Sequence, residues 1–397
     1  MLVEVITSND DPDRGGFGAR VHGIVSMFSR FADVRVVRTD SLEGPRIPGV
    51  KYVDIPLHGG LRTRLGRVRT YYRTRFPRRE PVEPPDLVVV ESLDLLGLHQ
   101  FGPRVPTVLD EHNVYWNLLT YQLADAPFFR GWFGRSLLPR QWFLDRLLDR
   151  ARRFEVRAIR ASARILVTSD IDRQAIVAEC PDASSRVHVL PNCVDVERFP
   201  ALPEHPDSRD VVFVGDFNYV PNREAAEFVS RTLARGIPQA RFLLVGSNPP
   251  GARDRPSNVV ATGRVPDLGP ILRDAAVCIA PLAHGSGTRI KILTYLASAR
   301  PVVATTKACE GLPVLDGVHL LIRDDPREFR DAVRWLLDDA GARRSLASRG
   351  RELIASKLDW KVHVPWLQEF TADICSGAGA TTWSRGSRTR FEPSPSR

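Results

Sequence analysis

The stretch GSGTRIK, residues 285–291, has the composition of a binding site for a phosphate group. Exposed backbone N–H groups at the start of a helix bind anions, and the helix dipole strengthens that binding. The stretch supplies two glycines for a turn, two hydroxyl groups and two cations: Gly285, Gly287, Ser286, Thr288, Arg289 and Lys291. The Walker pattern GxxxxGK[ST] is absent. The alternative is a strand–turn–helix in which the glycines serve only the geometry of the turn.

A second glycine-rich turn lies near the start of the chain. Gly15, Gly16 and Gly18 are followed by Arg20. Glycine lets the backbone approach a ligand closely, so this turn is a second candidate for ligand binding. An ordinary turn between a strand and a helix remains the alternative.

The run DEHN, residues 110–113, closes a strand-like segment at its carboxyl end, where parallel sheets build their sites. The pattern favours a functional role for His112 and leaves the role of Asp110 open. The alternative is a set of hydrogen-bonding residues that caps the next helix.

Two patterns that suggest metal binding have simpler explanations. Asp170 and Asp172 form a DxD pair, but they follow a strand-like run and open a helical one, so Ser169 or Asp170 is expected to cap that helix. The five cysteines include no pair with the spacing of a metal knuckle and are expected to be reduced thiols. We therefore expect no metal site.

Strand-like and helix-like segments alternate along the whole chain, which predicts a parallel α/β architecture. Several strand-like runs are continuously apolar, as expected for strands covered by helices on both faces. The predicted strands are 2–7, 34–37, 52–55, 87–92, 107–113, 164–169, 187–192, 211–216, 241–246, 258–263, 277–282, 301–306 and 319–324. They divide into two Rossmann-like domains whose sheets face each other across a ligand-binding cleft.

The proline-rich stretch 198–210 marks the boundary between the two domains. We predict an N-terminal domain at 1–200, a linker at 201–209 and a C-terminal domain at 210–356. A C-terminal helix is expected within 357–375, with its return to the N-terminal domain left open. The final residues, 376–397, are predicted to be a disordered basic tail.

The formal net charge of +9 suits an anionic substrate, an anionic membrane surface or nucleic acid. No nucleic-acid-binding signature is present, so nucleic acid is not an expected partner. No apolar run approaches the roughly 20 residues that span a bilayer. The opening residues, MLVEVITSNDD, predict a first strand rather than a secretory leader, which favours a cytoplasmic location.

The stretch PLAHGSGTRIKILTYLASARPVVATTKACEGL, residues 281–312, resembles the donor-site signature of glycosyltransferase family 4, whose members are retaining enzymes of the GT-B fold. Further blocks similar to this family follow one another in the expected order. They are RGGFGARVHGI (14–24), VLDEHNVYW (108–116), RFEVRAIRASARILVTSD (153–170), VLPNCVDVERF (189–199), VFVGDFNYVPNREAAEF (212–228) and VVATGRVPDL (259–268). The resemblance extends to about Asp373.

The resemblance implies transfer of a sugar from a nucleotide-diphosphate sugar to an acceptor hydroxyl group, with retention of configuration and with no metal ion or cofactor. It makes residues 1–200 the acceptor-side domain and residues 210–356 the donor domain. It places His112 near the donor sugar and Arg289 and Lys291 near the departing diphosphate. The remaining donor-binding residues that it implies are Gly16, Gly18, Arg223, Gly285, Ser286, Gly287, Thr288, Thr294 and Glu310.

The sequence departs from the family at both of its usual glutamates, which are replaced here by Ser286 and Thr294. A hydroxyl group at 294 can still bond a ribose, although less strongly than a carboxylate, or it can simply pack in the core. Cys193 also replaces the usual glycine of the PNG block. These changes leave two alternatives open: a non-catalytic GT-B scaffold of a membrane glycan assembly, and a sugar-nucleotide epimerase.

Two arginine-rich stretches, 61–79 and 127–153, mix basic residues with aliphatic and aromatic ones. This composition suits peripheral attachment to an anionic membrane, here at the inner face of the plasma membrane. The expected acceptor is accordingly a glycan or a lipid-linked molecule. Ordinary helices with solvated arginines are the alternative.

Overall fold

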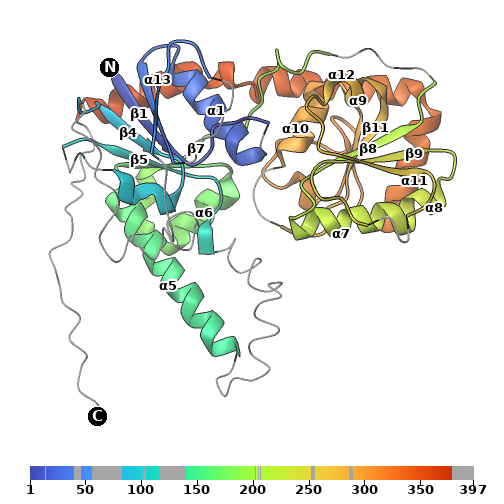
Figure 1. Cartoon of the computed structure of the whole chain (residues 1–397), viewed down its shortest axis with the longest axis horizontal. Coiled ribbons are helices and arrows are strands. Elements are labelled where there is room, and N and C mark those ends of the chain that lie inside the picture. Colours follow the sequence, from blue (N-terminus) through green and yellow to red (C-terminus); the bar gives the residue numbers. More distant parts are fainter. Residues whose placement is uncertain are drawn as a thin grey trace.

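The computed structural model contains two α/β domains side by side, each built on one parallel sheet (Figure 1). The structure describes residues 1–13, 15–39, 46–55, 83–99, 101, 104–116, 140–201, 203, 205, 207–251, 255–285 and 289–377. The predicted fold class, two Rossmann-like domains of the GT-B type, is confirmed.

The N-terminal sheet has seven strands in the order β3-β2-β1-β4-β5-β6-β7. Their bounds are β1 Leu2–Thr7, β2 Asp33–Arg38, β3 Lys51–Asp54, β4 Leu87–Val90, β5 Thr107–Glu111, β6 Arg164–Val167 and β7 Val187–Val189. All neighbouring strands are parallel. The central strand β4 is buried at every position, as its run of four apolar residues requires.

The C-terminal sheet has six strands in the order β10-β9-β8-β11-β12-β13, again all parallel. Their bounds are β8 Asp210–Val214, β9 Arg241–Val245, β10 Val259–Gly263, β11 Ala275–Ala280, β12 Val302–Ala304 and β13 Leu321–Ile322. Every strand segment predicted from the sequence therefore contains a strand. Most strands end earlier than predicted, because the chain turns into the loops at the carboxyl edge of each sheet.

Helices connect many of the successive strands and pack against both sheets. The described α-helices are α1 Gly16–Phe28, α5 Arg140–Ala161, α6 Asp170–Glu179, α7 Val220–Phe228, α8 Ala234–Gly236, α9 Gly269–Asp274, α10 Ile290–Ala297, α11 Pro326–Asp338, α12 Ala340–Lys357 and α13 Val364–Cys375. None of the helices in the described part of the chain is both long and apolar enough to cross a membrane.

The C-terminal segment returns to the N-terminal domain, where α13 packs against α1 (Figure 1). The helix expected within 357–375 is divided: a 3₁₀ turn spans Trp360–His363, and α13 begins at Val364. Pro365 lies in the first turn of α13, where its missing N–H costs no hydrogen bond. Residues 378–397, most of the predicted tail, lie outside the described residues.

The chain passes between the two domains twice, and the two passages lie side by side. Val194, after β7, forms a parallel bridge with Asp359, after α12. The N–H of Val194 donates to the carbonyl of Leu358 at 2.9 Å.

Candidate functional site

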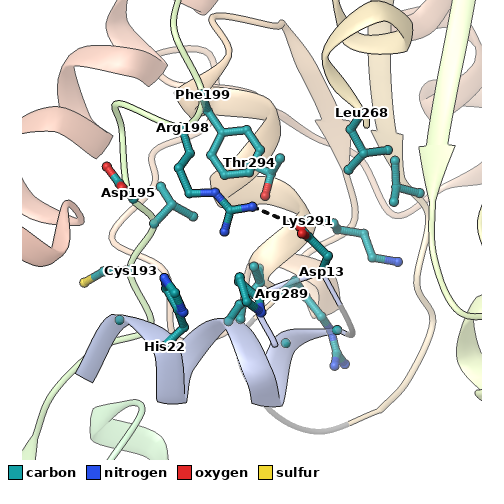
Figure 2. A pocket seen from close by; sticks show the side chains of 18 of the residues that line it. Asp13, His22, Cys193, Asp195, Arg198, Phe199, Leu268, Arg289, Lys291 and Thr294 are labelled. Carbon is teal, nitrogen blue, oxygen red and sulfur yellow. Dashed lines mark hydrogen bonds and ion pairs between the residues drawn. The ribbon is translucent and has the colours of Figure 1, made fainter. Parts of the chain in front are cut away.

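A cavity of about 900 Å³ lies between the two domains, beside the N-terminal half of α1 (Figure 2). The C-terminal domain contributes one wall of the cavity, at the carboxyl ends of four strands. The residues there are Gly215 after β8, Gly246 after β9, Arg264 after β10 and Leu282 after β11. Loops at the carboxyl ends of parallel strands are the usual location of ligand sites in such folds. The cavity therefore occupies the predicted kind of position.

The start of α1 lies close to the start of α10 beside this cavity. A Cβ atom built on Gly16 would lie 3.1 Å from Cδ1 of Ile290, so a larger residue at this position would require the Ile290 side chain to shift. Gly18 has a different role: its Cβ would lie 2.0 Å from the carbonyl oxygen of Asp11, and it does not line the cavity. Gly16 is thus a cavity residue, whereas Gly18 shapes the loop before α1.

The loop before α1 is tied to the rest of the molecule through Asp13. The guanidinium of Arg198 bonds to the Asp13 carboxylate at 2.9 Å, as drawn in Figure 2. From the opposite domain, Nη2 of Arg264 donates to the Asp13 carbonyl at 3.2 Å. These contacts hold the glycine loop against the C-terminal domain.

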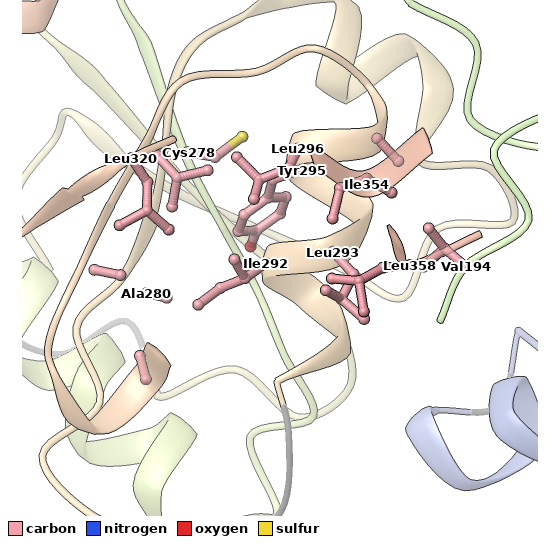
Figure 3. Close-up of a cluster of buried hydrophobic side chains, with 14 of the residues drawn as sticks. Val194, Cys278, Ala280, Ile292, Leu293, Tyr295, Leu296, Leu320, Ile354 and Leu358 are labelled. Atoms are coloured by element: carbon pink, nitrogen blue, oxygen red, sulfur yellow. The ribbon is translucent and has the colours of Figure 1, made fainter. Parts of the chain in front are cut away.

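Helix α10 is fixed in position by its apolar side chains (Figure 3). Tyr295 is fully buried, and its hydroxyl accepts a hydrogen bond of 2.7 Å from the N–H of Val214 at the end of β8. Ile292, Leu293 and Leu296 are fully buried as well. This packing places the first turn of α10, with its two cations, at the cavity wall.

Arg289 and Lys291 both line the cavity, as the sequence predicted for a pair of cations there. Arg289 is the N-cap residue of α10 and is only 8% exposed. Nζ of Lys291 donates to Oδ1 of Asn222 at 2.7 Å and lies 4.4 Å from the centre of the Phe213 ring. Burial, followed by the charge of Arg289, lowers the pKa of Lys291 well below its usual value.

The side chains of Tyr219 and Arg289 both lie close to the backbone of Gly285. A Cβ on Gly285 would lie 2.5 Å from the Tyr219 hydroxyl and 2.7 Å from Nη2 of Arg289, and φ at this glycine is +116°. A glycine is required here on both counts. The neighbouring candidates Ser286, Gly287 and Thr288 lie outside the described residues.

Of the other predicted donor-binding residues, one lines the cavity and two do not. Thr294 is 7% exposed and lines the cavity. Arg223 is exposed on α7 and does not line it. Glu310 is exposed, forms an ion pair with Lys307 and does not line it either. The sequence interpretation missed Tyr219 and Asn222, although both stand in the block VFVGDFNYVPNREAAEF, which resembles the family.

His112 lies at the end of β5 beside the start of α1 and is not among the residues that line the cavity. Its ring stacks on Phe17 with the ring centres 4.4 Å apart. Its Nε2 atom lies 3.0 Å from Oε2 of Glu91 and 3.2 Å from Oδ2 of Asp110. Two carboxylates therefore orient this imidazole.

Arg20 completes this buried cluster. It forms two hydrogen bonds of 2.7 Å to Asp110 and further bonds to the carbonyl of Leu190 and to Oδ1 of Asn192. Burial opposes ionisation of Asp110, but Arg20 and then His112 outweigh it and hold the pKa of Asp110 well below its usual range. Burial opposes protonation of His112, but Asp110 and Glu91 outweigh it and raise the pKa of this imidazole.

The ligand atoms of Glu91, Asp110 and His112 lie within 4.8 Å of one another, a spacing that a metal ion could use. Both oxygens of Asp110 already accept hydrogen bonds from the Arg20 guanidinium, whose positive charge would repel a cation. The arrangement is that of an ion-pair network.

The DxD pair has a structural role in α6. The Ser169 side chain accepts a hydrogen bond from the N–H of Asp172, which confirms the predicted N-cap. The Asp172 carboxylate in turn accepts hydrogen bonds from the hydroxyl groups of Thr168 and Ser169.

Two parallel-sheet domains that face a shared cavity, with Arg289 and Lys291 in its wall at the start of α10, are the arrangement of a GT-B protein. The sequence matches two families, described as Glycosyltransferase Family 4 over residues 14–198 and Glycosyl transferases group 1 over residues 208–339. The chain belongs to the group 1 glycosyltransferases of family 4. A comparison with curated proteins gave no match.

Solved structures with the same fold cover nearly the whole chain. Sucrose-phosphate synthase from Thermosynechococcus elongatus is 15% identical with a TM-score of 0.66, and the alignment covers 95% of this chain and 100% of that one. HepE of Anabaena, solved with UDP and glucose, is 14% identical with a TM-score of 0.65, covering 94% and 100%. WaaG, a glycosyltransferase involved in lipopolysaccharide biosynthesis, is 16% identical with a TM-score of 0.64, covering 94% and 100%.

Proposed function

We propose that this glycosyltransferase moves a sugar from a nucleotide-diphosphate sugar to an acceptor hydroxyl group, with retention of configuration and without a metal ion. One observation carries the proposal: two cations, the buried Arg289 and the half-buried Lys291, line the wall of the cavity between the domains. Cations at a cavity wall suit an anionic ligand, and a diphosphate is such an anion.

The chemical difficulty of this reaction is the negative charge that develops on the departing diphosphate. The bond from the anomeric carbon to the diphosphate oxygen breaks, and its electron pair leaves with the diphosphate. The acceptor oxygen bonds to the same face of that carbon, and its proton passes to an oxygen of the departing diphosphate. Arg289 and Lys291 would stabilise the developing charge. Domain closure would exclude water and limit hydrolysis of the donor.

The structural relatives indicate which donors and acceptors to test first. HepE was solved with UDP-glucose, so UDP-sugars are the first candidate donors. WaaG acts in lipopolysaccharide biosynthesis, which is consistent with our proposal of a glycan or lipid-linked acceptor and of a role in polysaccharide or glycolipid assembly.

We also propose peripheral attachment to an anionic membrane through the N-terminal domain. Helix α5 extends away from the sheet (Figure 1), and its exposed residues include Arg146, Arg150 and Arg157. The rest of the two basic stretches, 61–79 and 127–139, lies outside the described residues.

The test begins with a thermal-stability screen of UDP-, GDP- and ADP-sugars, followed by NMR of the product's anomeric configuration with and without a chelator. Arg289→Ala and Lys291→Ala should each lower turnover about a hundredfold or more and leave the fold intact. Arg231→Ala removes an exposed arginine from the same domain and serves as the matched control. Wild-type turnover in both cavity variants would contradict the proposal. A folded protein that binds no nucleotide diphosphate would favour the scaffold alternative, which the absent carboxylates at 286 and 294 keep open.

A further inference from the structure

Lys291 is held by two neutral groups. Its ammonium donates to the side-chain oxygen of Asn222 and lies over the ring of Phe213. Among the described residues, no carboxylate forms an ion pair with Lys291. Neutral groups therefore orient the amine, and no carboxylate among the described residues compensates its protonated form.

The side chain of Asn222 is fixed so that its oxygen faces Lys291. Its Nδ2 donates to the carbonyl of Asp216 at 2.9 Å, which leaves Oδ1 for the ammonium. Gly215 packs on it so closely that an added Cβ would lie 2.9 Å from Cγ of Asn222. Asn222 is only 8% exposed. A flipped amide would lose both hydrogen bonds, so the surroundings permit one orientation.

We propose that Asn222 is a positioning residue that aims Lys291 at the diphosphate of the donor while leaving the lysine's charge uncompensated. This inference rests on the proposed function. An amide suits this role because it accepts a hydrogen bond from the ammonium and carries no charge. A carboxylate of the same shape would form an ion pair with Lys291, and an incoming diphosphate would have to compete with it.

The experiment replaces Asn222 with the isosteric Asp and with Ala. Binding is measured by calorimetry with UDP, GDP, ADP and inorganic pyrophosphate, and with uridine as a probe that has no phosphate. For Asn222→Asp we expect diphosphate binding to weaken by about 10- to 100-fold, the range of a charge-assisted hydrogen bond. Uridine binding should not change. Asn222→Ala introduces no charge. It should weaken diphosphate binding by about tenfold, because the Lys291 ammonium loses the hydrogen bond that orients it.

Asn248→Asp is the matched control. Asn248 is exposed on the loop after β9 and has φ of +52°, a conformation that Asp also adopts. It adds the same charge at the same edge of the sheet without contacting Lys291, and it should bind diphosphates like the wild type.

A second measurement separates positioning from folding. In a Lys291→Ala background, Asn222→Ala should cause no further loss of diphosphate affinity, because there is no ammonium left to aim. Equal losses in both backgrounds would overturn the inference, as would wild-type diphosphate binding by Asn222→Asp and Asn222→Ala. A wild-type protein that binds none of the four probes that carry a diphosphate would overturn the proposed function itself, and this inference with it.

Discussion

Arg20 and Asp110 face each other in the interior of the N-terminal domain, joined by two hydrogen bonds of 2.7 Å. Their side chains are 1% and 0% exposed. Arg20 comes from α1 and Asp110 from β5, so the pair fixes the helix that lines the cavity to the strand that carries the His112 segment.

Breaking this pair should be strongly destabilising. Asp110→Asn keeps the shape but leaves the Arg20 guanidinium buried without its counter-charge, which typically costs about 3–5 kcal/mol. Arg153→Ala is the control, because it removes an exposed ion pair with Asp149 and should change stability by about 1 kcal/mol or less. Urea unfolding measures both. A loss below 1 kcal/mol for Asp110→Asn would show that the pair is not structural.

Glu91 should make stability depend on pH. Burial and then the charge of Asp110 raise its pKa from 4.5 to about 7. Between these values the folded protein keeps a proton that the unfolded chain has released. The contribution of Glu91 to the free energy of unfolding is therefore fully present below pH 4.5 and is lost as the pH rises through 7.

The variant Glu91→Gln keeps the shape of the side chain and removes its titration. The unfolding free energy of the wild type, relative to this variant, should fall as the pH rises from 4.5 through 7. Urea unfolding at half-unit steps of pH measures the difference. Two curves that stay parallel across this range would mean that Glu91 does not titrate as stated.

Thr294→Glu tests the ribose contact. Thr294 lines the cavity, so a glutamate there has room to reach the ligand rather than the core. We expect a melting temperature close to that of the wild type and nucleotide-diphosphate binding tighter by about fivefold, the difference between a charged and a neutral acceptor. A large drop in melting temperature would show that position 294 belongs to the core, and it would contradict a contact between this residue and the ribose.

Gly23→Ala should weaken the docking of the C-terminal segment. A Cβ at this position would lie 2.1 Å from the ring of Trp360. Overpacking of this kind typically costs about 1–3 kcal/mol. Gly251→Ala, at a glycine with nothing within 4 Å of the added carbon, is the control. Adding Trp360→Leu should recover part of the loss, and no recovery would place the strain elsewhere.

Membrane attachment should depend on salt. A protein ending at Cys375 should sediment with anionic vesicles at low ionic strength and be released at about 1 M salt, where the Debye length is roughly 3 Å. Changing Arg67, Arg69, Arg73 and Arg75 together to Gln should weaken the binding. A truncated protein that stays in the supernatant at low salt would rule out this mode of attachment.

The sequence predicted the strands well because buried parallel strands are continuous apolar runs, such as LVVV in β4. It predicted their ends less well. The predicted strand 187–192 included Pro191 and Asn192, which follow β7, although a proline has no N–H to donate to a sheet. It missed the break before α13, since a proline in the first turn of a helix and one in its interior look alike in sequence.

Charge and glycine in the sequence pointed to three residues of the cavity wall. Arg289, Lys291 and Gly16 all line the cavity. Asn222 was not predictable, because its role comes from a contact with Lys291 on another helix, 69 positions away in the chain. Arg223, the neighbour that the sequence favoured instead, points to the surface, since one residue along a helix turns a side chain by about 100°.

The return of the C-terminal segment to α1 has a consequence for biosynthesis. The last strand of the N-terminal sheet ends at Val189, but the ring of Trp360, which lies against Gly23, is synthesised roughly 170 residues later. At about 5–20 residues per second, a ribosome needs roughly 10–30 s for that stretch. During this time the whole C-terminal sheet is made, while one face of α1 still lacks its cover. We therefore expect the domain that emerges first to be the last to reach its native state.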